Sequence, residues 1–163
     1  MKTLLCLLSI SFFGASSLFT TAQAQVGGDV GGGLQVYVGD IEAVGVNVRG
    51  SVVFANHHAI KPDLGILFND PIQIIDFNLN YKYRFMIGDK VDIGPLAGLN
   101  VATVSADGPF GDRVSDSDVA LNLGGGFNFY PIDQVAIYPE VRFRIDDAFA
   151  VGLNFGAKYV FGR

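Results

Sequence analysis

The stretch Ile75-Asp76-Phe77-Asn78-Leu79-Asn80-Tyr81-Lys82-Tyr83-Arg84-Phe85 alternates apolar and polar residues without an exception. A strict period of two puts every apolar side chain on one face of an extended strand and every polar one on the other. Alternation of this kind recurs along the chain, and the segments that show it are 34–38, 44–54, 64–68, 75–85, 91–103, 119–129, 135–145 and 149–161. These eight segments predict an all-β protein. The glycine-rich residues before Leu34 either extend the first strand or precede it.

The composition supports this fold class. Of the 163 residues, 50% are apolar, 17% are charged and 21 are glycine. So many scattered glycines exclude a helix bundle, because glycine inside a helix costs about 1 kcal/mol relative to alanine. The formal charge of −5 argues against a nucleic-acid partner, which requires a basic face. The length fits one domain.

Residues 1–24 have the composition of a secretory signal peptide. Lys2 precedes an apolar run over 4–19, and the segment ends in Ala22-Gln23-Ala24. We expect cleavage before Gln25, which leaves residues 25–163 as the mature domain. The run is too short and too rich in serine for a membrane anchor, which needs about 20 apolar residues. The single cysteine, Cys6, lies in this segment, so the mature chain has no disulfide.

The connections between the strands indicate their order in the sheet. Residues 86–90 and 130–134 have the composition of hairpin turns, whereas residues 105–118 form a longer, polar and acidic connection. Residues 55–63 are expected to form a further turn, and it is a long one. A chain of hairpins gives an up-and-down antiparallel sheet, and eight such strands remove their free edges by closing. We therefore predict an eight-stranded antiparallel up-and-down β-barrel.

The polar face of the strands indicates which side is the interior. It is rich in Asn, Gly, Ala and Ser rather than in the Lys and Glu of a water-exposed surface. Small residues mixed with opposite charges fit the narrow interior of an eight-stranded barrel, where buried charges have to pair. The charged residues that we assign to this lumen network are Arg49, Asp76, Lys82, Arg84, Asp92, Glu140, Arg142, Arg144 and Lys158.

The aromatic residues gather at one rim. If the first strand rises from the periplasm, the strands that descend toward it carry an aromatic girdle, as a membrane interface requires. Its predicted members are Phe54, Tyr83, Phe85, Phe127 and Phe129. Apolar residues therefore face outward, and the sequence predicts a transmembrane β-barrel. The alternative is a soluble, lipocalin-like barrel with its apolar residues inside.

The mature chain resembles the small outer-membrane β-barrel proteins of the OmpA/OmpX-like group. The most specific part is the run Asn154-Phe155-Gly156-Ala157-Lys158-Tyr159-Val160-Phe161, which is similar to the C-terminal insertion signal of such barrels. The resemblance implies that Asn154, Gly156, Tyr159 and Phe161 are recognised by the barrel-assembly machinery. The chain departs from the family by ending in Gly162-Arg163 rather than on the aromatic residue.

No combination of residues predicts catalysis, and we expect no catalytic residues, no metal and no cofactor. His57 and His58 are the only histidines, and neighbours on an extended chain point in opposite directions, so we expect a solvated turn. The acids of 105–118, among them Asp112, lack the spacing of an EF-hand, and we expect a solvated loop.

The expected function follows from this fold. We expect a protein of the cell outer membrane with a structural or surface-interaction role, because eight strands leave an interior that side chains fill. The alternatives are a narrow pore for small solutes and the soluble carrier of apolar ligands. The expected partners are outer-membrane lipid, lipopolysaccharide and, during biogenesis, the barrel-assembly machinery.

Overall fold

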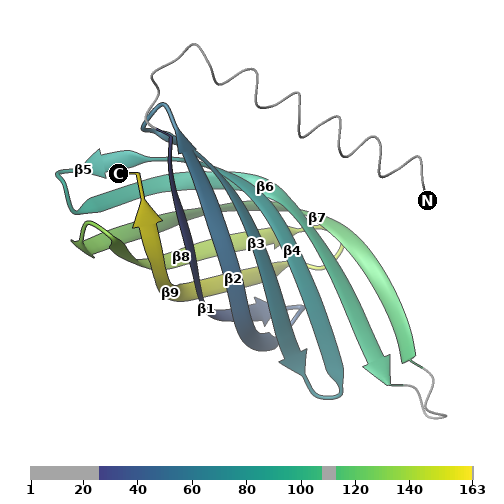
Figure 1. Ribbon diagram of the computed structural model, residues 1–163. Helices are drawn as coiled ribbons and strands as arrows, with labels where there is room; N and C mark the ends of the chain where they lie inside the picture. Colours follow the sequence, from purple (N-terminus) through teal and green to yellow (C-terminus); the bar gives the residue numbers. More distant parts are fainter. Residues whose placement is uncertain (1–25, 108–112, 163) are drawn as a thin grey trace, which may run out of the picture.

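The computed structural model describes residues 26–107 and 113–162, which form one closed antiparallel β-barrel (Figure 1). The predicted signal peptide lies outside the described residues. The strands are β1 (Gly27–Gly39), β2 (Ala43–Phe54), β3 (His58–Asn69), β4 (Ile72–Tyr83), β5 (Phe85–Ile87), β6 (Val91–Asp107), β7 (Arg113–Ile132), β8 (Val135–Ile145) and β9 (Ala150–Phe161). In the described part of the chain, no helix is long and apolar enough to cross a membrane.

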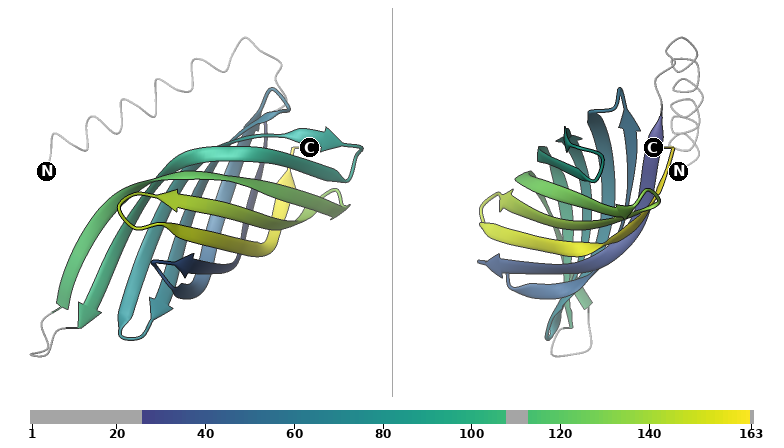
Figure 2. Two further views of the ribbon diagram at one scale, coloured as in Figure 1. Left: turned by 180° about the vertical axis from the view of Figure 1, so that it is seen from behind. Right: turned by 90° about the vertical axis from the view of Figure 1, so that its left-hand side faces the viewer.

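The barrel has eight strands, because β4 and β5 are two parts of one. Both pair with β6, in the same register, and only Arg84 separates them. Every strand pairs with the next in sequence, and β1 closes the barrel by pairing with β9 from Gly28–Phe161 to Gly39–Ala150. Figure 2 shows from two further sides that the strands wrap around a common axis. The prediction of an eight-stranded up-and-down barrel is confirmed.

Two ends of the barrel are distinguished below. The proximal end holds the start of β1, the end of β9 and the turns at 55–57, 88–90 and 133–134. The distal end holds the connections at 40–42, 70–71 and 146–149, together with the end of β6 and the start of β7.

The predicted long turn over 55–63 is wrong. β3 begins at His58, and the turn before it is tight, with left-handed φ angles of 48° at Ala55 and 61° at Asn56. Phe54 pairs directly with His58, so the turn has only the three residues 55–57. Pro62 concealed the strand in the sequence, because proline interrupts the alternation and lowers the expectation of a strand.

The predicted long acidic loop over 105–118 is also mostly strand. β6 continues to Asp107 and β7 begins at Arg113, so the two strands pair as far as these two residues. Hydroxyl groups join them, with 3.0 Å between the Oγ atoms of Ser105 and Ser115. Asp112 lies outside the described residues. The glycine-rich residues before Leu34 belong to β1 and pair on both sides.

The two faces of the strands differ as the alternation predicts. Leu79 points outward and is 46% exposed, whereas its neighbour Asn80 points into the barrel and is 1% exposed. The same holds for outward Phe77 and buried Asp76. The outer face is therefore apolar, and the interior holds most of the buried polar groups. Such a distribution is the one found in transmembrane barrels.

Three outward-facing prolines interrupt the pairing of the strands. The pairing of β2 with β3 has a gap at Pro62, that of β6 with the β4–β5 strand has a gap at Pro95, and that of β7 with β8 has a gap at Pro139, with the same register on both sides of each gap. Proline has no N–H to donate to a neighbouring strand. The barrel is consequently less tightly paired at these three positions.

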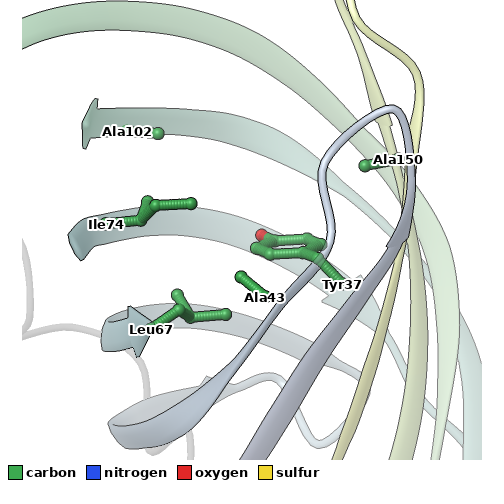
Figure 3. Packing of buried hydrophobic residues seen from close by; sticks show 6 residues of the cluster. All are labelled: Tyr37, Ala43, Leu67, Ile74, Ala102 and Ala150. Atoms are coloured by element: carbon green, nitrogen blue, oxygen red, sulfur yellow. The ribbon is translucent and has the colours of Figure 1, made fainter. Parts of the chain in front are cut away.

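An apolar cluster lies inside the barrel near its distal end (Figure 3). Its buried members come from six strands, and they are Tyr37, Ala43, Leu67, Ile74, Ala102 and Ala150. Ile41, Ile72 and Val104 pack against the cluster. The polar lumen thus ends distally in apolar side chains.

Candidate functional site: the barrel lumen

Five charged side chains meet at the centre of the lumen, and we call them the central cluster: Arg49, Lys61, Asp63, Glu140 and Arg142. Arg49 Nη2 lies 2.6 Å from Asp63 Oδ2, and Arg142 Nη2 lies 3.0 Å from the same oxygen. Glu140 accepts hydrogen bonds from Arg49 at 3.2 Å, from Arg142 at 2.7 Å and from Lys61. Because β1 and β9 separate β2 and β3 from β8 in the sheet, these contacts cross the lumen.

Tyr138 packs beside the central cluster over two glycines. The Arg49 guanidinium carbon lies 4.1 Å from the centre of the Tyr138 ring, which is a cation–π contact. The Tyr138 hydroxyl would lie only 2.6–2.7 Å from a Cβ atom at Gly156 or Gly33, which pair with each other. The two glycines are therefore required for the tyrosine to cross the β1–β9 pair.

Asp76 differs from the expectation that every buried charge has a charged partner. It is fully buried, and its carboxylate accepts hydrogen bonds from four neutral donors: Gln35 at 2.6 Å, Tyr37 at 2.9 Å, Asn78 at 3.0 Å and Asn100. No ion pair involves it among the described residues. Several hydrogen bonds can stabilise an ionised carboxylate as a counter-charge does.

Asparagine side chains fill the level between Asp76 and the central cluster. Asn78 accepts hydrogen bonds from Asn100 at 3.0 Å and from Asn122 at 2.7 Å. On the opposite wall, Asn47 donates to Asn154 at 2.9 Å. Amides both donate and accept, so a narrow interior lined by them needs little water.

A second charged group lies toward the proximal end. Asp92 accepts hydrogen bonds from Lys82 at 2.7 Å, from Arg84 at 2.9 Å and from Tyr130 and Asn128. Lys158 pairs with Asp29 at 2.8 Å. Toward the distal end, Arg144 pairs with Asp118 at 2.9 Å and with Asp146. Ion pairs thus occupy the lumen at three levels.

The structure places all nine charged residues selected from the sequence inside the barrel. It adds Asp29, Lys61 and Asp63, which the sequence analysis missed because Lys61 and Asp63 fell in the supposed turn and Asp29 among the glycines. A signal for two of them was present. Ile60, Leu64, Ile66 and Phe68 keep to even positions, which puts Lys61 and Asp63 on the inner face.

The five predicted girdle residues lie at the proximal end on the outer face, and the histidines join them. Phe54 stacks on His58 with 5.5 Å between ring centres, and Tyr83 contacts both His58 and Phe85. His58 Nδ1 lies 2.6 Å from the Tyr81 hydroxyl. The expectation that both histidines occupy a solvated turn is therefore wrong for His58, which begins β3 within the aromatic cluster.

The four residues of the predicted assembly signal lie on β9 and alternate between the faces. Asn154 is buried beside Arg49, whereas Tyr159 and Phe161 point outward at the proximal end. The Phe161 ring packs over Gly28, where a Cβ atom would lie 2.5 Å from the ring. Packing at the β1–β9 closure thus uses residues of the run that resembles the insertion signal.

The described residues contain no group of three or more His, Cys, Asp or Glu side chains arranged to hold a metal ion. The cavities in this part of the chain lie at the two ends of the lumen and on the outer face. The distal cavity has about 250 Å³ and reaches Asp76 between Tyr37 and Arg144.

Solved structures with the same fold include small outer-membrane barrels. The N-terminal β-barrel domain of Pseudomonas aeruginosa OprF has a TM-score of 0.65 and 15% identity, covering 85% of this chain and 100% of that one. Ail, the attachment invasion locus protein of Yersinia pestis, has a TM-score of 0.62 and 19% identity, covering 83% and 97%. Neisserial surface protein A has a TM-score of 0.62 and 13% identity, covering 87% of this chain and 100% of that one. No family model matches the sequence, and no curated protein is similar to it.

Proposed function

We propose that this protein is an outer-membrane β-barrel whose lumen is filled by side chains and whose role is structural or one of surface interaction. The apolar outer face supports the membrane location, since exposed apolar surface of this extent is costly in water. The similarity in fold to outer-membrane barrels supports it as well. The run over residues 1–24 supports export, and the C-terminal run supports recognition by the barrel-assembly machinery.

The observation that carries the proposal is the central cluster. Its side chains reach across the barrel axis from β2 and β3 to β8, and all five are at least 95% buried. A continuous water channel through this level would expose them.

The same interior argues against the soluble carrier. A carrier of apolar ligands needs an apolar cavity, and the lumen here presents mainly ion pairs and amides, with a cluster of apolar side chains at its distal end.

The distal end would be the interacting surface. Among side chains that the structure describes there, the acids are Asp40, Glu42, Asp70, Asp116, Asp118, Asp146 and Asp147, and Arg144 is the one cation. Lipopolysaccharide is itself anionic, so contact with this end requires divalent cations between them. One structure of Ail holds the heparin analogue sucrose octasulfate. We expect this acidic end to repel such a polyanion.

Planar-bilayer recordings test the filled lumen. We expect the purified protein to insert without stepwise conductance. As a positive control, alanine at all five positions of the central cluster removes the obstruction without leaving an unpaired charge in it, and should give measurable steps. Steps from the unmodified protein would contradict a filled lumen and favour the narrow pore. Fractionation of the cells tests the location, which the proposal requires to be the outer membrane.

A further inference from the structure

The outer face of the barrel carries an apolar groove over β6, β7 and β8, in the proximal half. It has a volume of about 580 Å³, and Gly125 lies on its floor. Its walls are formed by outward-facing apolar residues: Phe85, Ile93, Pro95, Phe127, Pro139 and Val141. The proline and aromatic side chains have little conformational freedom, so the groove exists before anything binds to it.

Nothing in the backbone requires glycine at position 125. Its φ angle is not left-handed, and a Cβ atom there would meet nothing closer than the Gly94 carbonyl oxygen at 3.5 Å. At the adjacent Gly124, by contrast, a Cβ atom would lie 2.1 Å from the Val141 carbonyl oxygen. The other outward positions of β7 nearby hold large residues, such as Leu123 and Phe127. The missing side chain at Gly125 therefore serves the groove rather than the strand.

Two prolines at the same level add to the depression. Pro95 is paired directly with Gly125, and the register of β7 and β8 places Pro139 opposite Phe127, at a gap in the pairing of these two strands. A proline ring covers less of the outer face than the branched and aromatic residues around it. An empty groove of this kind would leave its walls without packing partners.

We propose that this groove binds one acyl chain of a membrane phospholipid. The inference rests on the membrane location proposed above. The groove is continuous with the apolar outer face, so the molecule that meets it is lipid, and an acyl chain is narrow and apolar throughout. The groove extends from the girdle residues Phe85 and Phe127 toward the middle of the strands. The bound acyl chain would therefore belong to the leaflet at the proximal end. A second copy of the protein would need an interface of about 1,000 Å² or more, well beyond one groove.

Native mass spectrometry of the detergent-solubilised protein, after reconstitution with phosphatidylethanolamine, tests the proposal. Gly125→Leu fills the groove. Gly50→Leu is the matched control, because Gly50 faces outward on β2, away from the groove, and its added Cβ atom would also meet nothing closer than 3.5 Å. We expect the unmodified protein and Gly50→Leu to retain one phospholipid, and retention to fall at least tenfold in Gly125→Leu. Equal retention in all three, or equal loss in both variants, would overturn the proposal.

Photolabelling of the unmodified protein does not depend on the variants folding. A phospholipid with a diazirine at the end of one acyl chain should label Ile93, Phe127 and Val141 well above the outward residues of β2 and β3, such as Val46 and Leu64. Uniform labelling would contradict a specific site. A dimer that Gly125→Leu abolishes would overturn it in favour of a second copy. If the protein is instead monomeric without detergent, the membrane location itself fails.

Discussion

The carboxylate of Glu140 contacts Arg49, Lys61 and Arg142, so its charge is shared among three cations. The central cluster holds three cations and two carboxylates, a net charge of +1. Glu140→Gln raises this to +2 and leaves the buried Lys61 without its carboxylate partner, while Arg49 and Arg142 keep only Asp63. We expect a loss of about 3–5 kcal/mol in the free energy of unfolding, measured by denaturant titration of the folded barrel in micelles.

Lys61→Met supplies the matched comparison. It lowers the net charge of the same cluster from +1 to zero while keeping a side chain of similar length in place. We expect it to change the free energy of unfolding by less than about 1 kcal/mol, since a buried charge can be replaced by an apolar group at little cost. A Lys61→Met variant as unstable as Glu140→Gln would show that the Lys61–Glu140 ion pair itself, not the net charge of the cluster, determines its stability.

Neighbouring residues on β4 test the assignment of the two faces. Leu79→Arg places a cation on the outer face near mid-strand, which should cost roughly 2–4 kcal/mol and reduce the yield of inserted protein. Asn80→Ser changes a lumen side chain that accepts a hydrogen bond from Asn122 at 3.2 Å, which a serine hydroxyl is able to accept as well, and should be nearly silent. Insertion can be measured as the fraction of protein in the outer membrane, and equal tolerance at both positions would contradict the assigned faces.

Among the strands, those with the most regular alternation of apolar and polar residues were predicted best. β9 was predicted to within one residue at each end, and the β4–β5 strand to within three, because alternation depends only on the pleat and on which face meets lipid. β3 was found only in part, since Pro62 breaks its pattern. The polar ends of β6 and β7 were taken for a loop because strands that project beyond an apolar layer need no apolar face. The alternation of apolar and polar residues therefore does not reveal strand ends that extend beyond the apolar layer.

The sequence predicted which side chains face the lumen, but not which of them form ion pairs or hydrogen bonds with one another. Alternation is enough to put Arg142 and Glu140 inside, because it fixes direction along one strand. It does not reveal that Arg142 reaches Asp63, since that contact depends on the height and curvature of strands not adjacent in the sheet. Asp76 shows the same limit, because its four neutral donors come from three different strands.

The last strand allows a test of the predicted assembly signal. Replacing both Tyr159 and Phe161 with Ser should leave export intact but leave the protein unassembled in the periplasm. Replacing Phe143 and Phe149 with Ser is the control, because this pair is exposed to a similar extent at the distal end, with 6.3 Å between ring centres. Cell fractionation with immunoblotting measures both, and a normal outer-membrane yield of the first double variant would rule out the signal.

The whole molecule is one closed sheet, and its unfolding should be cooperative. Every strand has two hydrogen-bonded neighbours, so no strand can leave without opening the barrel. We expect the unheated protein to migrate differently from the boiled protein on a denaturing gel, with a single step between the two forms on heating. Several intermediate bands would indicate that the breaks at the prolines divide the barrel into separately unfolding parts.

The pairing of β1 with β9 has a consequence for biosynthesis. The twelve matched positions join residues more than 110 apart, so the first strand waits for its partner until translation is almost complete. Throughout that interval the nascent chain has two edge strands with unpaired backbone groups and an exposed apolar surface, and both promote aggregation. We therefore expect the unclosed chain to require a holding chaperone. A chain truncated by even one strand should remain unclosed and be degraded by proteases.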